Sequence, residues 1–292
     1  MSDVNIPEVT ISGLFEAGVH FGHKVSRWNP KMEPYIYGER NGTHIIDLTQ
    51  TFGLMKEALE NIYKVVRKNG KILFVGTTVQ AGPVILESAE KCAQYYVNHR
   101  WLGGTLTNWS TVSKSIKTLE GYEKILADQN KNPTFTKKEI LQLTRKIDKL
   151  GRYLNGIRGM NGTPDMIIVL DTRKDRLALR EAMKLNIPIV AIVDTNRNPD
   201  NITHPIPGND DSTRSIQHYC DLFAATILSA MKDALADAGV DLDKETGKSL
   251  KLGDKNKRVI KYKKSSHVKS RDVNSKNDTQ THSKDFEEKL GE

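Results

Sequence analysis

Three runs of consecutive apolar residues constrain the fold of this chain more than any other feature of its sequence. They occupy residues 72–75, 166–170 and 189–193. A run without alternating polar positions is typical of a strand that is covered on both faces. Each run is followed by a turn and then by a stretch with helical periodicity. This alternation predicts an α/β fold with three layers, in which helices cover both faces of a parallel sheet.

Shorter elements complete the predicted body. Asn41-Gly42 is typical of a tight hairpin turn between two strands. The glycines and prolines of residues 18–30 and 196–208 predict loops. Further expected elements are helices at 10–17, 49–68, 83–93, 173–185 and 212–238 and strands at 35–37, 43–46 and 95–97.

Between residues 106 and 161 the pattern changes to helices alone. Thr136 and Glu139 have the spacing of a capping box, which marks a helix start. Two helices with narrow apolar stripes predict an inserted antiparallel helical hairpin, packed as a coiled coil. The alternative is that both helices pack on the sheet. The stripes consist of Val112, Ile116, Leu119, Tyr122 and Leu126, and then Ile140, Leu143, Ile147, Leu150 and Leu154.

These patterns predict three parts. Residues 1–105 and 162–238 form the α/β sheet domain, and residues 106–161 form the helical-hairpin arm. Residues 239–292 form a basic C-terminal tail that we expect to be disordered until it meets a partner. The net charge of +8 is uneven, because residues 248–271 hold ten Lys and Arg but one acid. Cationic segments on an acidic body indicate a polyanionic partner, although solvated lysine-rich faces are the simpler explanation for any single run.

The composition also predicts the compartment. Cys92 and Cys220 lie far apart, without the spacing of a metal site or a disulfide framework, which favours a reducing cytoplasm. No apolar run approaches the roughly 18 residues of a membrane span, and the first residues lack the pattern of a signal peptide. We therefore expect a cytoplasmic protein without membrane contacts.

Three features are compatible with an enzyme, and each has a simpler explanation. The turn at 76–82 follows a buried strand but lacks a nucleotide-binding signature. Asp171 follows a strand, where it is equally suited to cap a helix. A metal would find candidate ligands in His20, His23, Asp194 and the pair Asp210-Asp211, but hydrogen-bonded loop histidines are favoured. No catalytic residues, bound metal or cofactor are therefore predicted.

Signals for RNA binding are more consistent. Loops with cations, amides and indole rings suit phosphates, sugars and unpaired bases. The stretch 98–109 holds two of the three tryptophans and a double glycine, and it is predicted to be a hinge-like joint between sheet and arm. The predicted RNA-binding residues are Arg27, Trp28, Asn29, Arg100, Trp101, Asn108 and Arg158.

The chain resembles the bacterial small-subunit ribosomal protein S2 family. The resemblance spans about residues 5–237, and the string Arg-Trp-Leu-Gly-Gly-Thr-Leu-Thr-Asn at 100–108 is its most specific part. Residues 18–23, 27–32, 164–171 and 188–196 carry the remainder.

The resemblance implies a flavodoxin-like (Rossmann-like) sheet and a structural role in the 30S subunit. It implies contacts with 16S rRNA and other small-subunit ribosomal proteins, among them the large mRNA-binding protein. No homo-oligomer and no catalysis are implied. The rival hypotheses are a nucleotide- or phosphosugar-binding α/β enzyme and a free RNA chaperone with a basic tail.

Overall fold

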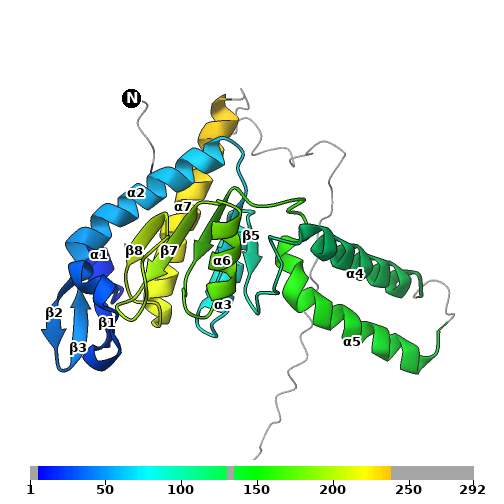
Figure 1. The fold of residues 1–292 in the computed structure, drawn as a ribbon. Coiled ribbons are helices and arrows are strands. Elements are labelled where there is room, and N and C mark those ends of the chain that lie inside the picture. Colours follow the sequence, from blue (N-terminus) through cyan, green and yellow to red (C-terminus); the bar gives the residue numbers. More distant parts are fainter. Residues whose placement is uncertain (1–5, 130–134, 238–292) are drawn as a thin grey trace, which may run out of the picture. The chain divides into compact units, whose positions relative to one another are not determined.

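A five-stranded parallel sheet forms the centre of the fold (Figure 1). The computed structural model describes residues 6–129 and 135–237, so the predicted tail 239–292 lies outside the described residues. The strand order is β5–β4–β6–β7–β8, and every neighbouring pair is parallel. Counted along the chain, this is the flavodoxin order 2-1-3-4-5. The strands are β4 (Ile72–Val75), β5 (Tyr95–Val97), β6 (Met166–Val169), β7 (Ile189–Val193) and β8 (His204–Pro207).

The three apolar runs become the central strands, and their alternate residues feed two cores. In β4, Phe74 points into one core and Leu73 and Val75 into the other. The period of two is that of a pleated strand, here with both faces covered. The first core lies under α2 (Leu48–Arg67), α3 (Ala81–Lys91) and α7 (Thr213–Asp237), and α1 (Ile11–Glu16) contributes Leu14 to it. The second core lies under α6 (Arg176–Lys184). The predicted three-layer α/β fold is therefore confirmed.

Two segments that were predicted as loops are strands. β8 was missed because Pro205 and Pro207 interrupt it, but a strand at the edge of a sheet tolerates residues without an N–H. β1 (Phe21–Lys24) was missed because it holds a glycine and a histidine. An added Cβ at Gly22 would lie 2.6 Å from Thr195 Cγ2, so this glycine permits close packing within a strand.

β1 belongs to a separate antiparallel sheet of order β1–β3–β2. β2 (Ile36–Arg40) and β3 (Thr43–Ile46) are joined by the predicted hairpin turn. Asn41 and Gly42 have φ values of 54° and 72°, as a tight hairpin turn requires.

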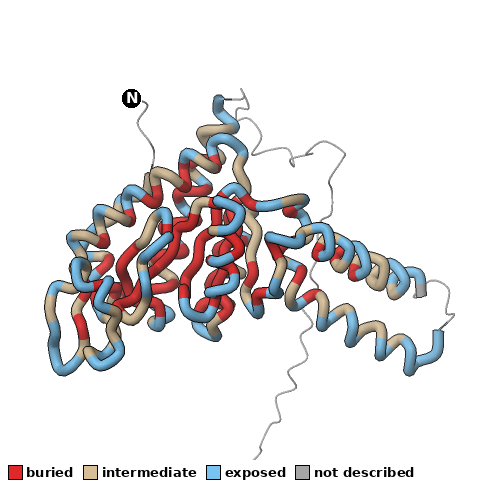
Figure 2. The backbone as a smooth tube through the Cα atoms, in the orientation of Figure 1, coloured by how far each residue is buried: buried red, intermediate tan, exposed pale blue. Residues whose placement is uncertain are grey.

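The insertion forms two helices, α4 (Trp109–Gln129) and α5 (Lys137–Leu154), which contact each other. The predicted capping box is present at the start of α5, where Thr136 and Glu139 bond reciprocally. The inner ends of both helices are buried, with Val112, Ile116 and Leu119 in the second core (Figure 2). The base of the arm is thus part of the core of the sheet domain. That the arm and the sheet form separate domains stays a prediction.

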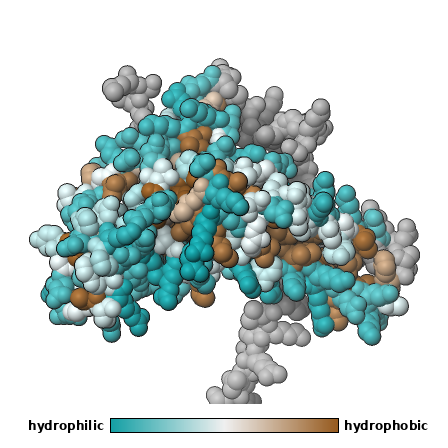
Figure 3. Space-filling view, viewed as in Figure 1, coloured by the Kyte–Doolittle hydropathy of each residue, from teal (hydrophilic) through white to brown (hydrophobic). Residues whose placement is uncertain are grey.

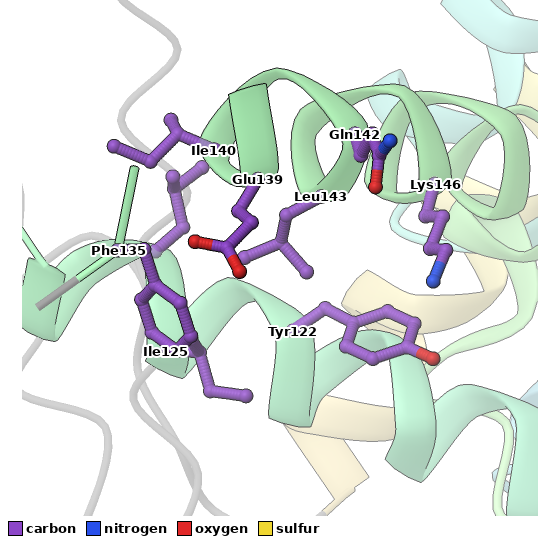
Figure 4. A pocket seen from close by; sticks show the side chains of 9 residues that line it. Tyr122, Ile125, Phe135, Glu139, Ile140, Gln142, Leu143 and Lys146 are labelled. Carbon is purple, nitrogen blue, oxygen red and sulfur yellow. The ribbon is translucent and has the colours of Figure 1, made fainter. Parts of the chain in front are cut away.

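Farther from the sheet, the seam between the two helices is open. A groove of about 230 Å³ lies between α4 and α5, and Figure 4 shows the aromatic ring of Tyr122 on one wall. The ammonium group of Lys146 lies 5.8 Å from the centroid of that ring. Among the described residues, no helix has both the length and the apolar character needed to cross a membrane.

Candidate nucleic-acid interface

One carboxylate organises the glycine-rich loop 98–109. Glu181 of α6 is buried, and its two oxygens accept five hydrogen bonds from the loop. The Trp101 indole N–H donates at 3.0 Å, and backbone amides donate at 2.8–3.1 Å. Burial acts to raise the pKa of Glu181, but these hydrogen bonds outweigh burial, and the pKa lies below its usual value. The donors are Trp101, Gly104, Leu106 and Thr107, the last through both its amide and its hydroxyl.

These bonds change the interpretation of the loop. The loop was predicted to be a hinge-like joint between sheet and arm. In the structure it is a turn whose conformation is held by hydrogen bonds to Glu181 of α6. Trp101 is only 5% exposed and packs in the second core, so its ring presents no face to a base in this structure. Gly104 has a φ of 84°, which glycine adopts without strain.

Arg100 and Asn108 lie on the outside of the same loop. Arg100 is exposed, and it makes no ion pair or side-chain hydrogen bond with a residue in the described part of the chain. Asn108 is also exposed, but its side-chain oxygen accepts hydrogen bonds from Ser110 and Thr111 in the first turn of α4. Arg100 is therefore the loop residue whose charge is available to a ligand.

Arg158, just beyond α5, has a partner within the arm. Its guanidinium bonds both oxygens of Glu123 at 2.9 Å and 2.6 Å. This bidentate geometry fixes both side chains. An RNA phosphate at Arg158 would have to compete with that carboxylate.

The predicted residues Arg27, Trp28 and Asn29 follow β1. Trp28 is half-buried, with its ring 5.3 Å from the ring of His44. Asn29 donates its backbone N–H to Thr195, and its side chain accepts from the amide of Lys31. Arg27 is exposed at the end of a short 3-10 helix (Val25–Arg27).

Arg27 and Asn29 open onto a large cleft near the C-terminal ends of β6 and β7, which we call the basic cleft. It has a volume of about 980 Å³. Its described walls come from three separate parts of the chain: β1 with the segment after it, α6 with the turn before it, and the loop after β7. The lining residues are His23, Arg27, Asn29, Thr172, Arg173, Arg176, Leu179, Arg180, Met183, Asn196, Arg197, Asn198, Asp200 and Asn201.

The lining of the basic cleft is strongly cationic. Of the described residues that line it, five are arginines and one, Asp200, is an acid. Asp200 pairs with Lys31, which lies outside the cleft. Arg197 is held by Asp210 and Asp171 and is nearly buried. Figure 3 shows strongly hydrophilic side chains over α6 on this face. Four arginines therefore supply the available charge: Arg27, Arg173, Arg176 and Arg180.

Of the residues that line this cleft, only Arg27 and Asn29 were predicted from the sequence to bind RNA. The three arginines in α6 and in the turn before it were missed. A usable signal was present, because Arg173, Arg176 and Arg180 follow one another at intervals of three and four. That spacing places side chains on one face of a helix.

Comparison with known proteins decides the family. The family described as Ribosomal protein S2 matches residues 14–230. The chain belongs to the ribosomal protein S2 family. A relative from Rickettsia felis (strain ATCC VR-1525 / URRWXCal2) is 54% identical over 268 residues, covering 90% of this chain and 91% of the relative. One from Rickettsia prowazekii (strain Madrid E) is 52% identical over 286 residues, 98% of this chain and 95% of the relative. Both are named small ribosomal subunit protein uS2.

In this S2 family member the usual ligand position of a flavodoxin-like sheet is filled from within. Ligands of such folds bind where the strand order reverses, here between the ends of β4 and β6. At that point the amide and hydroxyl of Thr77 donate to the buried carboxylate of Asp175, at 3.1 Å and 2.8 Å. Lys174 donates to the Thr77 carbonyl. Burial raises the pKa of Asp175 to about 6, against the effect of the bonds from Thr77.

The histidines considered as metal ligands are separated in the structure. His23 Nδ1 lies 3.0 Å from the buried carboxylate of Asp194, and His23 Nε2 lies 3.3 Å from Asp211. The hydrogen bond with Asp194 raises the pKa of His23. One ligand atom each of His23, Asp194 and Asp210 lies within 4.8 Å of the others. The ring of His20 instead stacks on Phe15 and contacts the tilted ring of Phe21. His23 is therefore hydrogen-bonded, although it lies in β1 rather than in a loop. That no metal binds here stays a prediction.

Asp171 caps the turn before α6 rather than the helix itself. Its carboxylate accepts the amides of Arg173 and Lys174 at 2.8 Å and 3.1 Å. The helix was predicted from residue 173, but it begins at Arg176. Asp171 thus fixes the turn that carries Arg173, one of the arginines that line the basic cleft.

Proposed function

We infer that the chain is a structural constituent of the small ribosomal subunit and is not an enzyme. The observation that carries this conclusion is the match to the S2 family over residues 14–230, together with relatives that cover nearly the whole chain. As a small-subunit component it associates with ribosomal RNA and ribosomal proteins in the cytoplasm, where it supports translation.

The enzyme hypothesis finds no support in the described residues. The turn at 76–82, which suggested a phosphate site, has Thr77 engaged by Asp175 and its carbonyl engaged by Lys174. A phosphate group would have to displace an internal carboxylate that is already hydrogen-bonded at that position.

We further propose that the RNA partner is 16S rRNA and that the protein helps to dock the large mRNA-binding protein of the subunit. Of the residues predicted from the sequence, Arg27 and Arg100 are the best supported, because both are exposed arginines without an ion pair among the described residues. The roles of Trp28, Asn29, Trp101, Asn108 and Arg158 at RNA stay predictions.

Sedimentation of cell lysate through a sucrose gradient tests the function. We expect the chain to migrate with 30S particles and to remain there through a high-salt wash. A soluble pool whose melting temperature rises with a nucleotide would instead support the enzyme. A pool that binds RNA but leaves the particles at high salt would support a free RNA chaperone.

For Arg100, the matched control is Arg152, an exposed arginine of the helical insertion. Arg100→Ala should reduce incorporation into 30S particles more than Arg152→Ala. Equal incorporation of both variants would remove Arg100 from the interface.

A further inference from the structure

We propose that the basic cleft binds the sugar–phosphate backbone of structured ribosomal RNA, and that Arg173, Arg176 and Arg180 are its principal phosphate contacts. This inference rests on the proposed function and names the site through which that function is performed.

The positive charge of the cleft is not balanced by acids. Arg27, Arg173, Arg176 and Arg180 are all exposed and form no ion pair with any residue of 6–129 or 135–237. Arg176 and Arg180 are four residues apart on one helix, so their like charges repel each other. This repulsion lowers the stability of the free protein and is relieved when a polyanion binds between them.

The acids in and beside the cleft already have cationic partners. Asp200 is the acid in the lining, and its carboxylate pairs with Lys31. Asp171 and Asp210 hold Arg197. The neighbouring carboxylates are therefore engaged, and an incoming phosphate meets the four free guanidinium groups.

The residue types that line the cleft suit the backbone of a nucleic acid rather than its bases. Among the residues that the structure describes, the lining contains no Phe, Tyr or Trp, so these residues offer no indole or phenyl platform on which an unpaired base would stack. It contains instead four asparagines, at positions 29, 196, 198 and 201, whose amides suit sugar hydroxyls and phosphate oxygens. Guanidinium groups bind phosphate with two parallel hydrogen bonds. Charges and amides without a stacking platform favour the backbone of folded RNA over single-stranded bases.

The test uses the full chain and 30S particles depleted of it. The variant Arg173→Gln/Arg176→Gln/Arg180→Gln removes three charges from the cleft. The control Lys56→Gln/Lys64→Gln/Lys68→Gln removes three exposed charges from α2 and from the residue that follows it. α2 covers the opposite face of the sheet. Circular dichroism and thermal unfolding establish that both variants fold. Affinity for the particles is measured between about 50 and 200 mM KCl.

We expect the arginine variant to bind more weakly and to lose about three from the slope of log affinity against log salt, since each phosphate contact contributes about 0.9. The control should keep the wild-type slope. A third variant, with lysines at the three positions, should recover most of the slope because it restores the charges.

Each other outcome has a distinct meaning. If the wild type fails to bind depleted particles, the proposed function itself is wrong. If the wild type binds and the arginine variant binds equally well, or both triple variants lose affinity equally, the cleft is not the site. Weaker binding with an unchanged salt slope would assign the cleft to a protein partner and overturn the RNA proposal.

Discussion

Replacing Glu181 should destabilise the protein more than any single change on its surface. The Glu181 carboxylate accepts five hydrogen bonds while it is only 9% exposed. A hydrogen bond to a charged group contributes about 1.5–3 kcal/mol, and contributions within one network are not additive. Breaking a buried network costs about 3–5 kcal/mol, and we expect Glu181→Ala to fall in this range.

The conservative change Glu181→Gln tests whether the charge and both acceptors matter. One oxygen accepts from Trp101 and Gly104, and the other accepts from Leu106 and Thr107. A glutamine keeps one acceptor oxygen, but its NH2 group faces the remaining donors and cannot accept their hydrogen bonds. Because those donors are left unsatisfied, the free energy of unfolding should fall by about 1–3 kcal/mol.

Urea denaturation at neutral pH measures the stability of both variants, followed by the fluorescence of the three tryptophans, of which Trp101 is the one bonded to Glu181. The matched control is Glu87→Gln on α3, where Glu87 is exposed and pairs with Lys91 at 2.9 Å. Such an i,i+4 pair contributes only about 0.3–0.5 kcal/mol. If Glu181→Gln costs no more than Glu87→Gln, the carboxylate does not organise the loop and our reasoning is refuted.

Three further predictions concern the rest of the molecule. The raised pKa of Asp175, about 6 against a usual 3.8, means that the folded state holds a proton that the unfolded state releases between these values. At about 1.4 kcal/mol per pKa unit the full effect is about 3 kcal/mol, and the free energy of unfolding should fall by about 2 kcal/mol of this as pH rises from 4 to 6. Urea titrations should show that Asp175→Asn loses this slope, and an equal slope in both proteins would contradict the assignment. Leu119 is fully buried in the second core, so Leu119→Ala should lower the free energy of unfolding by about 2–5 kcal/mol in the same assay. Ile125 on the same helix is 40% exposed, so Ile125→Ala should lower it by less than about 1 kcal/mol. Similar losses would show that the base of the arm is not part of the core. Replacing residues 122–147 with a short glycine linker should leave a body that unfolds cooperatively, with a calorimetric midpoint near that of the wild type. Removing residues 106–160 should lower this midpoint. Equal midpoints for the two deletions would show that the whole arm is independent of the sheet.

The fold was predictable where local pattern and burial agree. β4, β6 and β7 are apolar at every position and buried on both faces, so their sequence has no competing explanation. β8 was missed because prolines argue against a strand unless its place at the edge is known in advance. β1 was missed for a similar reason, since Gly22 is required by Thr195, a residue distant in the sequence.

The candidate site was predictable only in part, because long-range contacts determine it. Trp101 looked like a stacking residue until Glu181, 80 positions away, was found to hold its indole N–H. Arg158 looked like a phosphate ligand until Glu123 was found beside it. In both cases the residue type correctly indicated which interactions the side chain can make. Whether the side chain is available to a ligand depends on its partner in the folded protein, which is distant in the sequence.

α6 links the two surfaces that the sequence suggested separately. Glu181 faces inward and fixes the loop that carries Arg100, while its neighbour Arg180 lines the basic cleft. Successive helical residues point about 100° apart, so one short helix serves both sides. A displaced α6 would therefore disturb both surfaces together. Measurements of stability and of RNA binding separate these effects. Arg180→Gln should weaken RNA binding without lowering the free energy of unfolding. Glu181→Gln should lower the free energy of unfolding while the arginines of the cleft keep their charges.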